Sequence, residues 1–321
     1  MVKAGSVSVI IPVYNGAPFI AEAIRSILNQ TFNDLEVIVV DDASTDKTLE
    51  VVSLFSGDKR LKVISHAHNQ GAAAARNTGI KAALNSEFIA FLDADDISLP
   101  SRIERQVHYL IDHPSISCLG SSVELFGDAS GSMDMLCSPD DIAASTMFSC
   151  EFLMPTLVFR SSAMRLLKGV WFIPEYGANC DWEIIARMVM LGMKVANLPD
   201  RLVLYRRWES QMTAKIIDTI DCPATGLRSD MLAWYGIKKD QQDILSHMVA
   251  SPCYWPIEYQ HSEPIDQDRV DSWLDFIEQH SRAYFPSEKL NSSSVSKIIA
   301  RCRAKNDCNF EVDSRLRAAA I

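Results

Sequence analysis

The chain has 321 residues and a formal charge of −10, from 31 basic and 41 acidic side chains. With 48% hydrophobic and 22% charged residues, it has the composition of an ordinary soluble globular protein of one large or two smaller domains. The net negative charge argues against a general nucleic-acid binder, because such proteins carry excess lysine and arginine. The same charge raises a question about any phosphate-bearing substrate, which an acidic protein would repel.

Cysteine usage and hydropathy point to a reducing, aqueous compartment. None of the eight cysteines forms a C-x-x-C pair, which argues against a zinc site and against a dense disulfide framework. No signal peptide precedes the first strand-like run. The longest apolar stretch, residues 147–159, is interrupted by Glu151 and Pro155 and is shorter than the roughly 20 residues of a membrane span. We expect a cytoplasmic protein, with contact at the inner face of a membrane left open.

The first hundred residues alternate between strand and helix patterns. A β-rich run at 6–13 ends at the turn pair Asn15-Gly16, and a helix follows Pro18. Further apolar runs predict strands at 35–40, 61–64 and 88–92. Helices are predicted over residues 49–54, over the alanine-rich stretch 72–83 and after Pro100.

The pattern is less regular beyond residue 114. We predict strands near 117–126, 156–159 and 201–205 and a helix over 181–191. From residue 216 the chain has scattered tryptophan, tyrosine and proline and amphipathic stretches such as 270–277. This composition predicts a helical C-terminal extension over 216–321.

Alternating strands and helices predict a doubly covered, mostly parallel α/β sheet with right-handed crossovers. In such sheets ligands bind beyond the carboxyl ends of the strands. Two acidic clusters, 41–42 and 93–96, each directly follow a predicted strand. We therefore expect both clusters to face the same crevice, although about fifty residues separate them.

The pair Asp93-x-Asp95 offers hard oxygen ligands of the kind that Mg²⁺ and Mn²⁺ prefer. Helix capping and turn formation are the alternative, since aspartate commonly does both. Several other classes lack their motif: there is no G-x-G-x-x-G after the first strand, no P-loop, no H-E-x-x-H and no G-x-S-x-G.

Four ordered motifs carry a resemblance to a known family. They are Val9-Ile-Ile-Pro-Val-Tyr-Asn15, Val39-Val-Asp-Asp-Ala-Ser-Thr-Asp46, Asn69-Gln-Gly-Ala-Ala-Ala-Ala-Arg76-Asn77-x-Gly79 and Phe91-Leu-Asp-Ala-Asp-Asp96. Together they resemble the family 2 inverting glycosyltransferases of the GT-A fold, over about residues 6–215. The resemblance implies a GT-A domain at 1–215, with a nucleotide-binding half at about 1–100 and an acceptor half at about 101–215.

The resemblance also implies a donor site for a nucleotide-diphosphate sugar, with a UDP-sugar as the first expectation. In that site Pro12 and Tyr14 line the base pocket, and Asp42 hydrogen-bonds the base. Arg76 lies near the nucleotide, Asp93 meets the ribose or the metal, and Asp95 ligates Mn²⁺ or Mg²⁺. Such a cation stabilises the charge of the leaving diphosphate.

An inverting transfer needs a base that removes the proton of the acceptor hydroxyl. By resemblance Asp181 falls on the base position, and Glu183 is a weaker candidate for contact with the acceptor or with the base. The alternative for Asp181 is a helix N-terminal cap, which aspartate favours.

Two positions depart from the family pattern. Cys180 stands where the family usually has glutamate, and Trp208 stands where a tail motif often has histidine. Arg206 or Arg207 would then supply positive charge toward the diphosphate, and Trp208 would stack on a sugar ring. The alternative is that 205–208 simply ends a strand.

Two other features are expected to lie on the surface. His66 and His68 form an H-x-H pair in a polar loop, with no third ligand in view. The basic stretch 297–305 offers either a solvated helix face or a contact with anionic lipid.

We predict a metal-dependent inverting glycosyltransferase that acts on a hydroxyl of a glycan or lipid-linked acceptor and has no nucleic-acid partner. One alternative is a GT-A binding or scaffold module, because of Cys180 and Trp208. A haloacid-dehalogenase-type phosphatase is the other, although its D-x-D lies on the first strand. If a cation mediates diphosphate binding, the net charge of −10 does not oppose it.

Overall fold

The computed structural model describes residues 3–208, 227, 229–233, 237, 267–284 and 291–307. The strands are β1 (Lys3–Val13), β2 (Leu35–Asp41), β3 (Leu61–Ser65), β4 (Ser86–Phe91), β5 (Ile97–Ser98), β6 (Ile116–Gly127), β7 (Gly131–Met133), β8 (Val158–Arg160) and β9 (Lys194–Arg207). The helices are α1 (Ile20–Leu28), α2 (Thr48–Ser53), α3 (Ala72–Ala83), α4 (Arg102–Asp112), α5 (Pro139–Ser145), α6 (Ser161–Leu166), α7 (Cys180–Met190), α11 (Gln267–Tyr284) and α12 (Ser292–Asp307), with 3-10 turns η1 (Met154–Thr156) and η2 (Pro174–Asn179).

The predicted α/β class is confirmed, and the first four predicted strands correspond to β1, β2, β3 and β4. The alanine-rich helix α3 has the predicted bounds. The sequence patterns missed β5, β7, α5 and α6, each of which has seven residues or fewer. Elements this short do not complete enough periods of a strand or helix to stand out.

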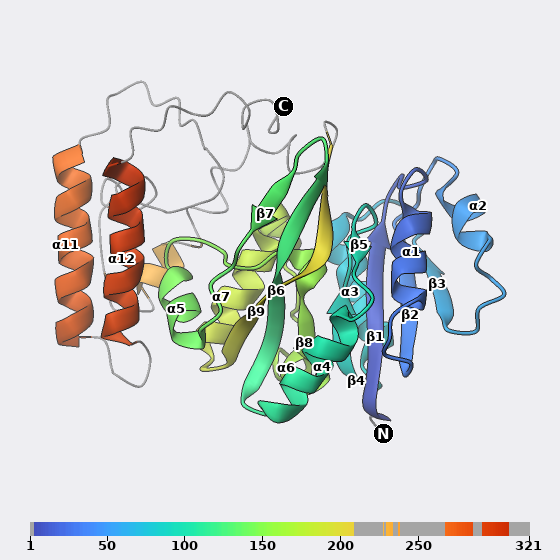
Figure 1. Cartoon of the computed structure of the whole chain (residues 1–321), viewed down its shortest axis with the longest axis horizontal. Helices are drawn as coiled ribbons and strands as arrows, with labels where there is room; N and C mark the ends of the chain where they lie inside the picture. The colour runs from blue at the N-terminus through green and yellow to red at the C-terminus, as the bar shows by residue number, and fades with distance from the viewer. Residues whose placement is uncertain are drawn as a thin grey trace.

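Nine strands form one sheet, in the order β3-β2-β1-β4-β8-β6-β9-β5, with β7 paired to the side of β6 (Figure 1). Neighbouring pairs among β3, β2, β1 and β4 are parallel, as is the pair β6 and β9. The short strand β8 runs antiparallel to both β4 and β6, so the six longest strands share one direction. Their carboxyl ends consequently lie at one edge of the sheet.

Apolar side chains of alternate β1 residues enter two separate cores. Val9 and Ile11 join a cluster with buried residues of α1 and α4, while Ile10 joins a cluster with α3 and α7. Helices therefore cover both faces of the sheet, as the nearly continuous apolar strands predict. Helix α3 approaches β1 closely at Gly79, where an added Cβ would lie 2.4 Å from Cγ2 of Ile10.

The C-terminal helices α11 and α12 lie side by side at the end of the molecule opposite β3, and α12 packs against α5 (Figure 1). A third apolar cluster joins Trp182 of α7 with Trp273 of α11 and Ile298 of α12. The predicted helical extension is confirmed for these two helices. They share a core with the helix that begins next to Asp181.

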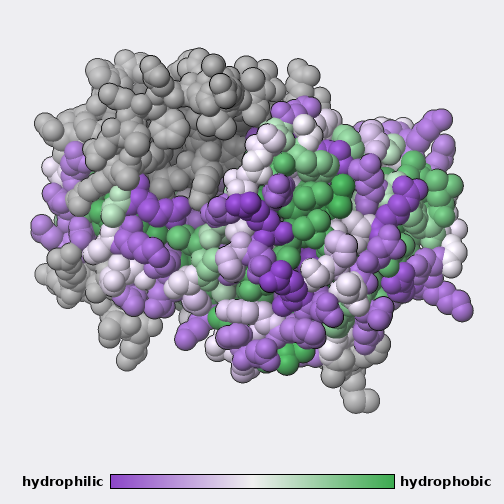
Figure 2. Space-filling view, in the orientation of Figure 1, coloured by the Kyte–Doolittle hydropathy of each residue, from purple (hydrophilic) through white to green (hydrophobic). Residues whose placement is uncertain are grey.

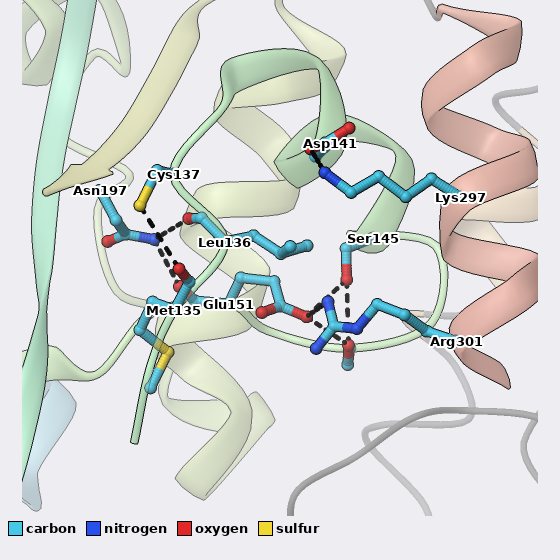
Figure 3. A network of polar contacts seen from close by, with 10 residues as sticks. Met135, Leu136, Cys137, Asp141, Ser145, Glu151, Asn197, Lys297 and Arg301 are labelled. Atoms are coloured by element: carbon cyan, nitrogen blue, oxygen red, sulfur yellow. Dashed lines mark hydrogen bonds and ion pairs between the residues drawn. The ribbon is translucent and has the colours of Figure 1, made fainter. Parts of the chain in front are cut away.

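Polar contacts also fasten α12 to this region (Figure 3). Arg301 lies 3.4 Å from Oε1 of Glu151, a carboxylate that is 1% exposed and also accepts a hydrogen bond from Ser145 Oγ at 2.8 Å. One turn away, Lys297 pairs with Asp141 of α5. Both basic residues thus have acidic partners within the chain, and they offer an anionic membrane less net charge than the sequence suggests.

Hydrophilic side chains cover much of the described surface in the view of Figure 2, and hydrophobic ones gather in separate patches. Within the part of the chain that the structure describes, no helix combines the length and apolar character needed to cross a bilayer.

Candidate active site

The ends of β1, β2 and β4 bring the two acidic clusters to one edge of the sheet. The amide of Asp42 donates to the carbonyl of Val13 at 2.8 Å, and that of Leu92 donates to Ile10 at 3.0 Å. A Cβ added at Gly16, in the loop after β1, would lie 3.7 Å from Cβ of Ala94 between Asp93 and Asp95. The loops that follow three neighbouring parallel strands therefore lie together at this edge, where ligands of such sheets bind.

Arg76 of α3 links the acidic loop after β4 to the start of α7. Its Nη2 lies 3.3 Å from Oδ1 of Asp93, and its Nη1 lies 3.6 Å from Sγ of Cys180. Burial disfavours the charge of Arg76, but Asp93, Cys180 and Asp181 outweigh burial and raise the pKa of the guanidinium. Its Nε is buried and has no hydrogen-bond partner among the described residues. Arg76 is thus a buried cation between two acidic groups.

Asp181 is the second residue of α7 and lies half-buried beside this cation. Its Oδ1 accepts a hydrogen bond from the backbone N–H of Trp182 at 2.7 Å, so it binds one of the free amides of the first helical turn. Burial raises the pKa of Asp181 to about 6, although that hydrogen bond and the charge of Arg76 act in the opposite direction. A carboxylate with a pKa this close to neutrality is suited to proton transfer.

Glu183 points into the interior instead. It is 5% exposed, and its two oxygens accept from Nε and Nη2 of Arg187 at 2.7 and 2.9 Å. Arg187 also donates to the carbonyls of Val170 and Trp171. This bidentate pair favours a structural role for Glu183 over the predicted contact with the acceptor.

Asp42 is occupied by donors of the protein itself. Its carboxylate, 2% exposed, accepts from the amides of Gln70 at 2.9 Å and Gly71 at 2.7 Å, and from Nδ1 of His66 at 2.7 Å. The other ring nitrogen of His66 lies 2.9 Å from Oγ1 of Thr78. Asp42 thus ties the start of α3 to the ends of β2 and β3, and its contact with a base stays a prediction.

The expected exposure of the H-x-H pair is wrong for His66, because only 8% of its side chain is exposed, and holds for His68. No local pattern separates the two histidines, since the partners of His66 lie 24 and 12 residues away.

The two residues predicted to line the base pocket both lie at the end of β1. Pro12 is half-buried and registers against Val40 of β2, and Tyr14 is 50% exposed just beyond the strand. The ring of Tyr14 is therefore accessible as a surface for a planar ligand.

The tail of β9 holds the acidic loop from the other side. The amide of Arg206 donates to Oδ1 of Asp96 at 2.7 Å, and its Nε donates to the carbonyl of Asp95, also at 2.7 Å. Nε1 of Trp208 donates to Oδ2 of Asp95 at 2.9 Å. Arg206 also pairs with Glu22 of α1. Residues far apart in sequence thus fix both the backbone and the side chain of Asp95.

The guanidinium of Arg206 lies between two aromatic rings, 4.6 Å from the centroid of Phe19 and 4.3 Å from that of Phe126. With its ion pair to Glu22, this arrangement favours a positioning role over the predicted contact with a diphosphate. Sequence reasoning missed this function because its signal, an arginine after a strand, is common on protein surfaces.

The acidic loop has the chemistry of a cation site. Burial and the charge of Asp93 both raise the pKa of Asp95. Burial and the charges of Asp95 and Asp93 raise the pKa of Asp96. Oδ2 of Asp96 is buried without a described partner. A divalent cation would relieve this repulsion, and Mg²⁺ commonly uses one or two carboxylates plus substrate phosphates. Among the described residues, no group of three or more His, Cys, Asp or Glu side chains is arranged around a metal position. The loop therefore fits a cation that shares its ligands with a bound phosphate.

The sheet order and the acidic loop beyond the strand ends are those of a GT-A glycosyltransferase. The profile of glycosyl transferase family 2 matches residues 8–142. An uncharacterized glycosyltransferase of Haemophilus influenzae is 30% identical over 318 residues, which cover 92% of this chain and 97% of the relative. The chain belongs to glycosyl transferase family 2.

More distant similarities agree with this family. The UDP-Glc:alpha-D-GlcNAc-diphosphoundecaprenol beta-1,3-glucosyltransferase WfgD of Escherichia coli is 40% identical over 124 residues, 39% of this chain and 48% of its own length. TarS 1-349 of S. aureus, in complex with UDP-GlcNAc, superposes with a TM-score of 0.61 at 20% identity, covering 97% of this chain and 91% of that one. A mannosyltransferase of Pyrobaculum calidifontis in complex with GDP-Man and Mn²⁺ gives 0.55 at 19% identity, covering 95% of this chain and 88% of its own. These two solved structures support the fold.

Proposed function

We propose that this glycosyltransferase takes a hexosyl or related sugar from a nucleotide-diphosphate donor and transfers it, with inversion, to a hydroxyl group. The relatives support such a donor. WfgD is named for UDP-Glc, and the similar structures hold UDP-GlcNAc or GDP-Man. A UDP-sugar is our first expectation for this chain.

The observation that carries the proposal is the position of Arg76 between Asp93 and the start of α7. One buried guanidinium contacts the acidic loop at 3.3 Å and the residue next to Asp181 at 3.6 Å. A donor phosphate at the acidic loop and an acceptor hydroxyl at Asp181 would therefore lie within one small crevice. Proximity of this kind is a main source of rate acceleration.

Asp181 is our candidate general base. Its carboxylate would accept the proton of the acceptor hydroxyl as the oxygen attacks the anomeric carbon and the bond to the diphosphate breaks. A pKa of about 6 leaves it ionised at neutral pH and strong enough to accept that proton. A single displacement on the face opposite the leaving group inverts the anomeric centre.

Asp95 and Asp93 would hold Mn²⁺ or Mg²⁺. When bound, such a cation neutralises the charge that develops on the leaving diphosphate. The chain itself keeps Asp95 in place through Arg206 and Trp208, and it supplies positive charge beside Asp93 through Arg76.

The acceptor belongs to the same proposal. WfgD is named for a diphosphoundecaprenol-linked acceptor, and we propose a glycan or lipid-linked hydroxyl for this chain. We also propose that residues 1–215 form the glycosyltransferase domain and that the C-terminal extension, 216–321, contributes to the choice of acceptor. A lipid-linked acceptor would place the enzyme in the cytoplasm, at the inner face of a membrane.

A thermal-shift panel of nucleotide sugars, each with and without Mn²⁺ or Mg²⁺, tests the proposal. We expect one donor to raise the melting temperature only with the cation, and Asp95→Ala to abolish that rise. Asp181→Asn should keep donor binding while turnover falls. If no nucleotide sugar in the panel stabilises the protein, the proposal is refuted.

The scaffold alternative is favoured by Cys180 and Trp208, the two departures from the family pattern. It predicts donor binding with neither hydrolysis nor transfer of the sugar to any acceptor tested. Family membership leaves the phosphatase alternative without support.

A further inference from the structure

Trp208 makes a contact that neither the family assignment nor the proposed chemistry explains. It follows directly after β9, whose pairing with the two-residue strand β5 brings it beside the acidic loop. Its indole N–H donates to Oδ2 of Asp95 at 2.9 Å. The ring packs edge-on against Phe19, with centroids 5.1 Å apart and planes inclined at 61°.

An indole N–H can only donate, and it carries no charge. It therefore occupies one oxygen of the carboxylate without neutralising it, unlike an arginine or a lysine. The other oxygen, Oδ1, accepts no hydrogen bond from another described residue and has lone pairs for a cation. Because Phe19 packs against the ring and Arg206 holds the carbonyl of Asp95, the carboxylate has little freedom to rotate.

We propose that Trp208 is a positioning residue for the cation site: its N–H holds Oδ2 of Asp95 so that Oδ1 faces the bound cation. This inference rests on the proposed function, because it assumes that Asp95 is a metal ligand. The function of Trp208 then depends on its N–H group. Stacking on a sugar would instead depend on the face of the ring. Metal ligands are commonly oriented by hydrogen bonds of this kind.

The test is Trp208→Phe, which keeps an aromatic ring against Phe19 and removes the N–H. Trp171→Phe is the matched control, because Trp171 also donates its indole N–H at 2.9 Å, to the carbonyl of Met164. Free Mn²⁺ is measured by electron paramagnetic resonance during titration of each protein in the presence of UDP. The melting temperature of each protein is measured in parallel.

We expect Mn²⁺ to bind about tenfold more weakly to Trp208→Phe than to the wild type, as loss of a hydrogen bond to a charged ligand predicts. Trp171→Phe should bind Mn²⁺ as the wild type does. Affinity of Trp208→Phe within twofold of the wild type overturns the inference and leaves the proposed function intact. An equal loss in Trp171→Phe also overturns it. A wild type that binds no Mn²⁺ with UDP refutes the metal dependence and this inference together.

Discussion

Replacing Asp181 with asparagine is expected to slow the enzyme and to stabilise the fold at the same time. The carboxylate is half-buried in the first turn of α7, near Asp93, and its pKa is raised to about 6. An aspartate in an unfolded chain has a pKa of about 3.9. Because the folded state binds the proton more tightly, the contribution of Asp181 to the stability of the wild type is greatest below about pH 4 and falls as the pH rises through 6.

The size of this effect follows from the two pKa values. The two values differ by about two pKa units, and each unit corresponds to 1.36 kcal/mol. Ionisation of Asp181 therefore lowers the free energy of unfolding by at most about 3 kcal/mol at pH 8, and by about half of that at pH 5. Asp181 retains some contact with solvent, so we expect a gain of about 1 to 3 kcal/mol for Asp181→Asn at pH 8. Loss of a general base should lower turnover by about 10² to 10⁴.

Urea unfolding at pH 5 and pH 8, followed by tryptophan fluorescence, measures the stability of both proteins. Asp128→Asn, at an exposed aspartate, is the matched control and should change neither stability nor turnover. The pH profile of kcat/KM should fall below about pH 6 in the wild type. If the Asp181→Asn variant is no more stable than the wild type at pH 8, or if it keeps full turnover, the reasoning is refuted.

Three further substitutions test polar contacts of α12 and of the site. Arg301→Met should lower the free energy of unfolding by about 2–4 kcal/mol, because it leaves the carboxylate of Glu151 buried without its cation. Adding Glu151→Gln should restore at least half of that loss in urea titrations. If stability does not recover, the loss does not have an ionic cause. His66→Ala removes the ring that bridges Asp42 and Thr78, and calorimetry should show about 1–3 kcal/mol of lost stability; an unchanged melting curve would argue against the bridge. Arg206→Lys keeps the positive charge but removes the planar guanidinium, whose Nε donates to the carbonyl of Asp95. Titration calorimetry in the presence of UDP should show about tenfold weaker binding of Mn²⁺. Wild-type affinity would show that the guanidinium does not position Asp95.

Local sequence patterns were sufficient for the first half of the fold and for the location of the crevice. Long apolar strands and an alanine-rich helix have periods that are visible in one pass, and the rule for parallel sheets places Asp41–Asp42 and Asp93–Asp96 at one edge. The patterns did not predict β5, which aligns β9 with the acidic loop, because a strand of two residues has no period.

The sequence by itself determined the kinds of chemistry available to this protein: a parallel α/β sheet, carboxylates at its strand ends, and a further aspartate at a helix start. Only the tertiary structure decided which of these groups are free to act. Glu183 is held by Arg187 and Asp42 by three donors, whereas Asp181 accepts a hydrogen bond from one other described residue, Trp182, and has a pKa near neutrality. The reason is physical: the partners of Asp42 and of the acidic loop, such as His66, Arg76 and Trp208, lie 17 to 113 positions away in the sequence, and no local pattern encodes those contacts. The Glu183–Arg187 pair, by contrast, has the local i,i+4 spacing of a helix.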